Sequence, residues 1–255
     1  MRAMLAFLVA LVLAPHAAVG EEVVLGLSSD KVSITTSFDG SEILIFGAVK
    51  RETPIPADAP LEVVITVAGP EFPALVRRKE KKFGIWVNAA SVEVDSAPSF
   101  YAVATTGPMD QVLTRVEDLR QKISVERVIR SVGAPANIED SASFTEAVIR
   151  IRQSEKLYQK LEGQVALDEQ TLFRTAIKLP ANLTEGDYVT RIFLTRNGEV
   201  VSSYETSIDV RKVGLERWLY ALAHDNAPLY GLMSLAIAIL AGWGASTAFR
   251  LLRNS

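Results

Sequence analysis

The sequence predicts a mainly β protein: an immunoglobulin-like β-sandwich with a two-helix insertion, then a juxtamembrane helix and one C-terminal transmembrane helix. Three observations carry this prediction. Apolar and polar residues alternate with a period of two over residues 23–103 and again from 165, which is typical of strands with one buried face. Between about 109 and 162 the period changes to 3.6. Residues 229–249 contain no charged side chain.

The N-terminal hydrophobic segment differs from the C-terminal one. The apolar run 5–14 is too short to cross a bilayer, and small residues suited to a signal peptidase follow it at Ala18 and Gly20. We therefore expect a signal peptide over residues 1–20, cleaved after Gly20. The alternative is an uncleaved N-terminal anchor. Cleavage would leave residues 21–212 as an extracytoplasmic domain.

The first group of strands follows from alternation and turn signals. Residues 32–38 and 61–67 each predict a strand with one dry and one wetter face, and residues 43–49, apolar on both sides, predict a central strand. Strands at about ten-residue spacing between glycine- and proline-rich turns are typical of a β-sandwich. We expect Trp86 to fill the core, with ligand stacking as the alternative. The turn signals are 38–41, 54–56, 68–70 and 97–98.

The insertion over about 109–162 is predicted to hold two helices. Apolar residues recur at helical spacing over 110–132 and over 143–161. Gly133-Ala134-Pro135 between these segments breaks the helical pattern.

Strands are expected again at 171–179, 187–195 and 200–210. Asn197-Gly198 joins the last two and is a strong signal of a tight hairpin. We expect one sandwich assembled from the strands on both sides of the helices. Two separate β units with the helices as a spacer are the alternative.

The C-terminal region is divided into three parts. Leu215, Trp218, Leu219 and Leu222 recur at helical spacing, which predicts an amphipathic helix over 213–226 along the membrane surface or, equally, packed on the soluble domain. Residues 228–249 are predicted to span the bilayer and 250–255 to form a cytoplasmic tail. The prediction is a single-pass inner-membrane protein with the bulk of its chain in the periplasm.

Small residues at Ala238, Gly242 and Ala245 give the spanning helix a weak dimerisation signal. A homo-oligomer through this helix is therefore one expected assembly.

Composition excludes several classes of chemistry. The chain has no cysteine and two histidines, of which His16 lies in the predicted signal peptide and His224 beside the anchor. Thiol nucleophiles, cysteine-ligated zinc, Ser-His-Asp triads and multi-histidine metal sites are thus excluded from the main domain. An excess of 30 acidic over 27 basic residues argues against nucleic acid as a partner.

We predict no catalytic, cofactor-binding or metal-binding residues. Three acidic groupings are the only candidates for carboxylate catalysis, and neighbouring acids on a strand point to opposite faces, which makes them poor ones. They are Glu139-Asp140, Asp168-Glu169 and Glu185 with Asp187.

The run Arg77-Arg78-Lys79-Glu80-Lys81-Lys82 is strongly basic. It is interpreted either as a contact for an acidic partner or anionic lipid, or as a solvated strand end that protects an edge.

Short motifs spread over nearly the whole predicted mature chain resemble a family of putative transmembrane proteins from alphaproteobacteria. The resemblance assigns no catalytic residues, and its loose association with sulfite-exporter-like permeases implies an accessory role. The motifs are Gly84-Ile85-Trp86-Val87-Asn88, Tyr101-Ala102-Val103, Leu172-Phe173-Arg174, Leu179-Pro180-Ala181-Asn182, Gly186-Asp187-Tyr188-Val189, Lys212-Val213-Gly214-Leu215-Glu216-Arg217, Leu229-Tyr230-Gly231-Leu232, Gly242-Trp243 and Phe249-Arg250.

We therefore expect a non-enzymatic accessory or interaction module for a membrane partner such as a transporter. A tethered extracytoplasmic domain that binds or senses a small ligand is the alternative. A carboxylate-based enzyme is the third and weakest hypothesis.

Overall fold

The structure is a computed structural model, which describes residues 21–29, 31–34, 40–51, 59–131, 140–212 and 215–253. The predicted signal peptide, the turn at 54–56, the helix break at 133–135 and residue 139 lie outside these ranges.

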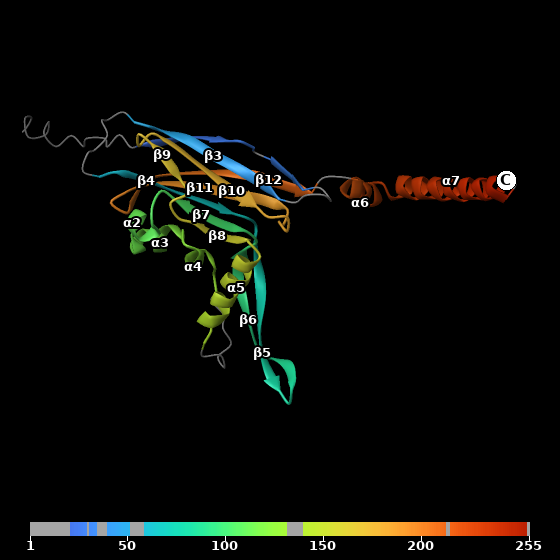
Figure 1. Ribbon diagram of the computed structural model, residues 1–255, viewed down its shortest axis with the longest axis horizontal. Helices are drawn as coiled ribbons and strands as arrows, with labels where there is room; N and C mark the ends of the chain where they lie inside the picture. Colours follow the sequence, from blue (N-terminus) through green and yellow to red (C-terminus); the bar gives the residue numbers. More distant parts are fainter. Residues whose placement is uncertain are drawn as a thin grey trace, which may run out of the picture.

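Twelve strands of the described residues form three sheets (Figure 1). The four-stranded sheet has the order β1 (Glu22–Leu27), β3 (Ser41–Lys50), β10 (Leu172–Leu179), β9 (Ala166–Asp168). The six-stranded sheet has the order β2 (Lys31–Ile34), β12 (Glu199–Lys212), β11 (Gly186–Arg196), β4 (Leu61–Ala68), β7 (Tyr101–Thr105), β8 (Tyr158–Leu161). The third sheet is a two-stranded ribbon of β5 (Glu71–Lys82) and β6 (Ile85–Pro98).

The four- and six-stranded sheets share one hydrophobic core. Ile45 and Phe173 from the first and Ile65 and Ile192 from the second are fully buried in the same cluster. Both sheets combine strands from before and after the helices, so the chain does not form two separate β units. The prediction of a mainly β fold with a helical insertion is confirmed.

The structure differs from the predicted burial of two strands. β4 was expected to have a wetter face, but Val64 and Thr66 are fully buried because β4 lies between β11 and β7 and packs against the helical insertion. β3 lies between β1 and β10, as expected for a central strand, yet its outward side chains Leu44 and Phe46 are exposed.

The prediction of one long helix over 110–132 is wrong, because this segment forms three short helices. They are α2 (Met109–Val112), α3 (Arg115–Gln121) and α4 (Val125–Val128). Leu113 and Thr114 are extended after α2, and Lys122 ends α3 in the left-handed conformation. The expected apolar face is also divided, since Val112 and Ile123 are buried but Val116 and Leu119 are exposed.

The six-stranded sheet holds these short helices by hydrogen bonds to their free carbonyl groups. Thr195 donates to Val112, Tyr101 donates its hydroxyl to Ile123, and Arg191 donates to Gln121 and Lys122. Such donors satisfy the carbonyls that a helix end leaves without an intrahelical partner. Tertiary contacts therefore replace the continuous helix that the periodicity predicted.

The second predicted helix, 143–161, is also shorter than expected. α5 (Ala142–Ser154) ends before Tyr158, and residues 158–161 form β8, parallel to β7. Tyr158 is buried, and its hydroxyl donates to the backbone carbonyl of Pro98 at the end of β6. The insertion thus contains four helices among the described residues, where two were predicted.

Beyond β12 the chain forms α6 (Leu215–Asp225) and α7 (Ala227–Arg253), which extend away from the sheets (Figure 1). Residues 227–246 of α7 are long and apolar enough to cross a membrane. This candidate span agrees closely with the predicted 228–249. α6 contacts α7 and lies beyond the ends of the strands, which is not the packing on the soluble domain offered as an alternative.

Candidate interaction surface

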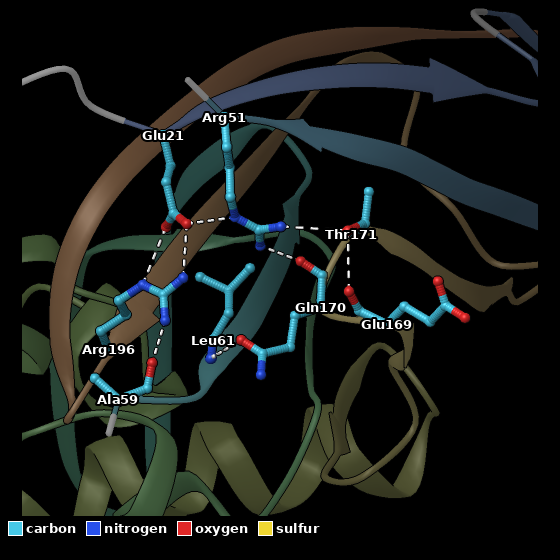
Figure 2. Close-up of polar contacts among 8 residues, drawn as sticks. All are labelled: Glu21, Arg51, Ala59, Leu61, Glu169, Gln170, Thr171 and Arg196. Carbon is cyan, nitrogen blue, oxygen red and sulfur yellow. Dashed lines mark hydrogen bonds and ion pairs between the residues drawn. The ribbon is translucent and has the colours of Figure 1, made fainter. Parts of the chain in front are cut away.

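A buried ion-pair cluster ties the two large sheets together at one end (Figure 2). Arg196 at the end of β11 binds both oxygens of the Glu21 carboxylate, with Nη2 2.6 Å from Oε1 and Nε 3.2 Å from Oε2. Arg51, directly after β3, places its Nε 2.6 Å from Oε1. The three side chains are only 13%, 11% and 8% exposed for Glu21, Arg196 and Arg51.

Two backbone carbonyls and one hydroxyl accept further guanidinium protons. Arg196 donates to the Ala59 carbonyl, and Arg51 donates to the Gln170 carbonyl and to the Thr171 hydroxyl. The cluster thereby joins the start of β1, the end of β3, the approach to β4 and the turn before β10. Because all three charged side chains are mostly buried and pair with groups of the protein itself, we assign the cluster a structural role.

The electrostatics of Glu21 follow from this arrangement. Burial by itself would raise the pKa of the carboxyl group, but the hydrogen bonds and positive charges of Arg196 and Arg51 outweigh burial and lower that pKa. Glu21 is therefore ionised at neutral pH and supplies the negative charge that two buried guanidinium groups need.

The acidic groupings considered for catalysis lie next to basic side chains. Asp140 is 3.7 Å from Arg78, Asp168 is 3.8 Å from Arg174 and Asp187 is 3.6 Å from Arg211. Asp140, Asp168 and Asp187 do not line the pockets beside the helical insertion or beside β10. No group of metal-ligating side chains occurs among the described residues.

The outer face of the four-stranded sheet carries a group of exposed apolar side chains together with charged ones, among them Arg174, which lies directly across from Phe46. Val24, Leu44, Phe46 and Leu172 point outward from three neighbouring strands. Phe46 lies across Gly26, where an added Cβ would come within 2.5 Å of its ring. This face is on the opposite side of the body from the helical insertion (Figure 1). We call these four residues the Phe46 face. Single exposed apolar residues are ordinary, whereas a contiguous group marks an interaction site.

The prediction that Trp86 fills the core is wrong. Trp86 lies near the end of the projecting β5–β6 ribbon and is 67% exposed. The basic run 77–82 lies on the same ribbon, at the end of β5. The ribbon leaves the body at β4 and returns to it at β7, so this end has no sheet to pack on (Figure 1).

Sequence reasoning did not identify the buried cluster or the Phe46 face. Glu21, Arg51 and Arg196 are separated by up to 175 positions, so no local pattern links them. The exposed apolar face had a signal in the segment 43–49, which is apolar at every position after Glu42 except Gly47, but that signal was interpreted as burial on both sides.

Comparison with known protein families gives a match over residues 22–251 to the family described as "Putative transmembrane protein (Alph_Pro_TM)". None of the curated proteins matches this chain.

Proposed function

The chain belongs to this family of transmembrane proteins, and from that premise we propose that it is a non-enzymatic module that docks onto a membrane-embedded partner. α7 is its membrane anchor, and the Phe46 face is its docking surface. The partner we propose is a membrane protein of the transporter or permease type. The observation that carries the proposal is a group of exposed apolar side chains on one sheet face of a chain that also carries a candidate membrane span.

The proposed topology has the β body in the periplasm and the end of α7 in the cytoplasm. It rests on the signal-peptide pattern of residues 1–20, with cleavage after Gly20. In this topology the body is an immunoglobulin-like sandwich, α6 lies along the headgroups, and a second copy can pack on α7 through its small residues. Amino-terminal sequencing tests the cleavage: a membrane-bound protein that still begins at Met1 contradicts it.

The Phe46 face suits a protein partner better than a soluble ligand. Its side chains lie on an open sheet surface, whereas small-molecule sites are concave. An aromatic side chain at the centre of an apolar group is a typical binding hot spot. Attachment to the bilayer raises the effective concentration of a partner in the same membrane.

Site-specific photocrosslinking in intact membranes tests the proposal. A photoreactive residue at Phe46 should capture one membrane protein, and the same residue at Val201 should not. Val201 is a matched control because it is similarly exposed, at 46% against 43% for Phe46, but lies on the other large sheet. Phe46→Asp should abolish the captured product while the circular dichroism spectrum is retained. Equal labelling from Phe46 and Val201 contradicts the proposal.

A groove beside the helical insertion supports ligand binding as the second candidate function. Its volume is about 510 Å³, and basic and acidic side chains both line it, including Arg115, Lys160, Asp118 and Glu162. Such a lining would suit a small zwitterionic or charged metabolite. Screening amino acids and organic anions for an increase in melting temperature tests it, because a ligand that binds only the native state stabilises it. A shift lost in Arg115→Ala would favour this function.

A further inference from the structure

At the end of the β5–β6 ribbon, the aromatic residue Phe83 has a backbone conformation that is unfavourable for a bulky side chain. Phe83 and Gly84 form a two-residue turn in which both φ angles are positive, at 52° and 87°. Turns of this kind favour Asn-Gly, and a bulky side chain at the first position is disfavoured. Strain that persists in a structure often marks a functional position.

Apolar side chains lie on both faces of the ribbon at this turn and at its apex. Phe83 is fully exposed, and Ile85 and Trp86 are 66% and 67% exposed. Ile85 and Trp86 are consecutive in β6, so they point to opposite faces of the ribbon, while Phe83 lies at its apex. A docking surface for a folded protein would be expected to present one face. Apolar groups on both faces and at the apex are suited to surroundings that contact the tip from every side, as a lipid layer does.

Basic side chains form a collar beside and behind the apolar tip. Lys81 and Lys82 lie directly across the ribbon from Trp86 and Ile85, and Arg77 and Lys79 follow. None of these four makes an ion pair within the described residues, whereas Arg78, which belongs to the same run, is held by Asp140 and the Phe144 ring. Aromatic residues beside lysines are typical of segments at the interface of a bilayer, and anionic headgroups attract such a collar.

The ribbon begins at the end of the body from which the anchor leaves. Ala68, the last residue of β4, pairs with Val189 of the neighbouring strand β11, and Val189 pairs on its other side with Ser207 of β12. The end of β4 thus lies one strand away from the last part of β12. β5 has 12 residues and therefore spans about 40 Å, enough to reach from that end of the body to a membrane surface. The ribbon and α7 leave the body in different directions (Figure 1), so contact with the bilayer that holds α7 requires the body to lean over.

We propose that the tip of the β5–β6 ribbon inserts into the headgroup region of an anionic phospholipid bilayer, as a second and reversible membrane contact beside α7. Phe83, Ile85 and Trp86 enter the interface, and the collar residues contact lipid phosphates. This contact does not depend on the docking partner proposed above. It would fix the tilt of the body relative to the membrane.

Trp86 provides the probe. The chain has three tryptophans, so replacing Trp218 and Trp243 by Phe in the full chain leaves Trp86 as the only one. This protein is reconstituted into vesicles of phosphatidylglycerol and phosphatidylcholine whose acyl chains are brominated near the headgroups. We expect blue-shifted Trp86 emission that the bromolipid quenches about twofold, and weaker quenching in vesicles of phosphatidylcholine alone or at high salt.

Two variants separate insertion from folding. Phe83→Asn introduces the residue that the turn conformation favours, so it should fold as well as the parent while Trp86 quenching falls. Replacing Lys79, Lys81 and Lys82 by Gln should remove the preference for anionic vesicles and leave the apolar contact. Trp86 emission typical of water, unaffected by bromolipid in either vesicle type, overturns the proposal. Blue-shifted emission without bromolipid quenching also overturns it, because Trp86 would then be buried against protein.

Discussion

Replacing Glu21 by Gln should destabilise the β body far more than the same change at the adjacent residue. The substitution preserves side-chain shape but leaves Arg51 and Arg196 buried without a counter-charge, at 8% and 11% exposure. Breaking a buried ion pair by removing one partner typically costs about 3–5 kcal/mol. Because Gln keeps one acceptor and both guanidinium groups keep carbonyl partners, we expect about 3 kcal/mol, or about 6–12 °C in melting temperature.

Glu22→Gln is the matched control. The Glu22 carboxylate is 3.3 Å from Lys50 Nζ, but the two side chains are 69% and 61% exposed. A pair so exposed is expected to contribute at most about 1 kcal/mol. The two variants therefore remove the same charge from neighbouring positions and differ chiefly in burial.

Thermal unfolding of the full chain in detergent, followed by far-ultraviolet circular dichroism, measures the difference. Tryptophan fluorescence is less suitable because Trp86, Trp218 and Trp243 are all exposed. Mass spectrometry should first show that both variants begin at the same residue, since both lie beside the predicted cleavage site. Equal melting temperatures for Glu21→Gln and Glu22→Gln would refute the reasoning.

The lowered pKa of Glu21 means that its carboxylate stabilises the fold above the ordinary value of 4.5 and that this contribution is lost as the pH falls through the lower folded-state value. Denaturant titrations of the parent and Glu21→Gln should accordingly converge in acid. Tyr101→Phe should lose about 1–3 kcal/mol in the same titrations, because the buried Ile123 carbonyl loses its donor. Burial raises the pKa of Tyr101 from 10.0 to about 12. Its neutral hydroxyl therefore stabilises the fold below pH 10, and this contribution is lost as the pH rises from 10 to about 12. In an alkaline titration the free energy of unfolding should fall less steeply for Tyr101→Phe than for the parent. Gly198→Ala should lower the melting temperature, because Gly198 has a φ of 79° and a Cβ there would lie 2.8 Å from the Thr114 methyl group; an unchanged temperature would contradict this view of the turn.

The sequence predicted well those features that depend on local chemistry. The Asn197-Gly198 hairpin forms as expected, with both residues at positive φ, because few other residues accept that conformation. The candidate membrane span follows from length and the absence of charge, and α7 agrees with it. The late strands β10, β11 and β12 were also located to within a few residues.

Features that depend on distant contacts could not be predicted in this way. Residues 110–132 have a helical period, yet Arg191 and Tyr101 of the sheet bind carbonyls that a continuous helix would have used. Trp86 was expected in the core because large aromatic residues usually are buried. Trp86 is exposed because the ribbon projects from the body, a feature that no residue within 71–98 indicates alone.

The pairing of β12 also has a mechanical consequence. This strand leads directly toward α6 and the anchor, and it is hydrogen-bonded antiparallel to β11 along most of its length and parallel to β2 over its last four residues. A pull transmitted from the membrane through α7 would act along the strand and strain these bonds together in shear, instead of opening them one after another. We expect single-molecule pulling from the C-terminus to show a higher rupture force than pulling across the sheet through the β5–β6 turn. Equal forces in the two directions would contradict this expectation.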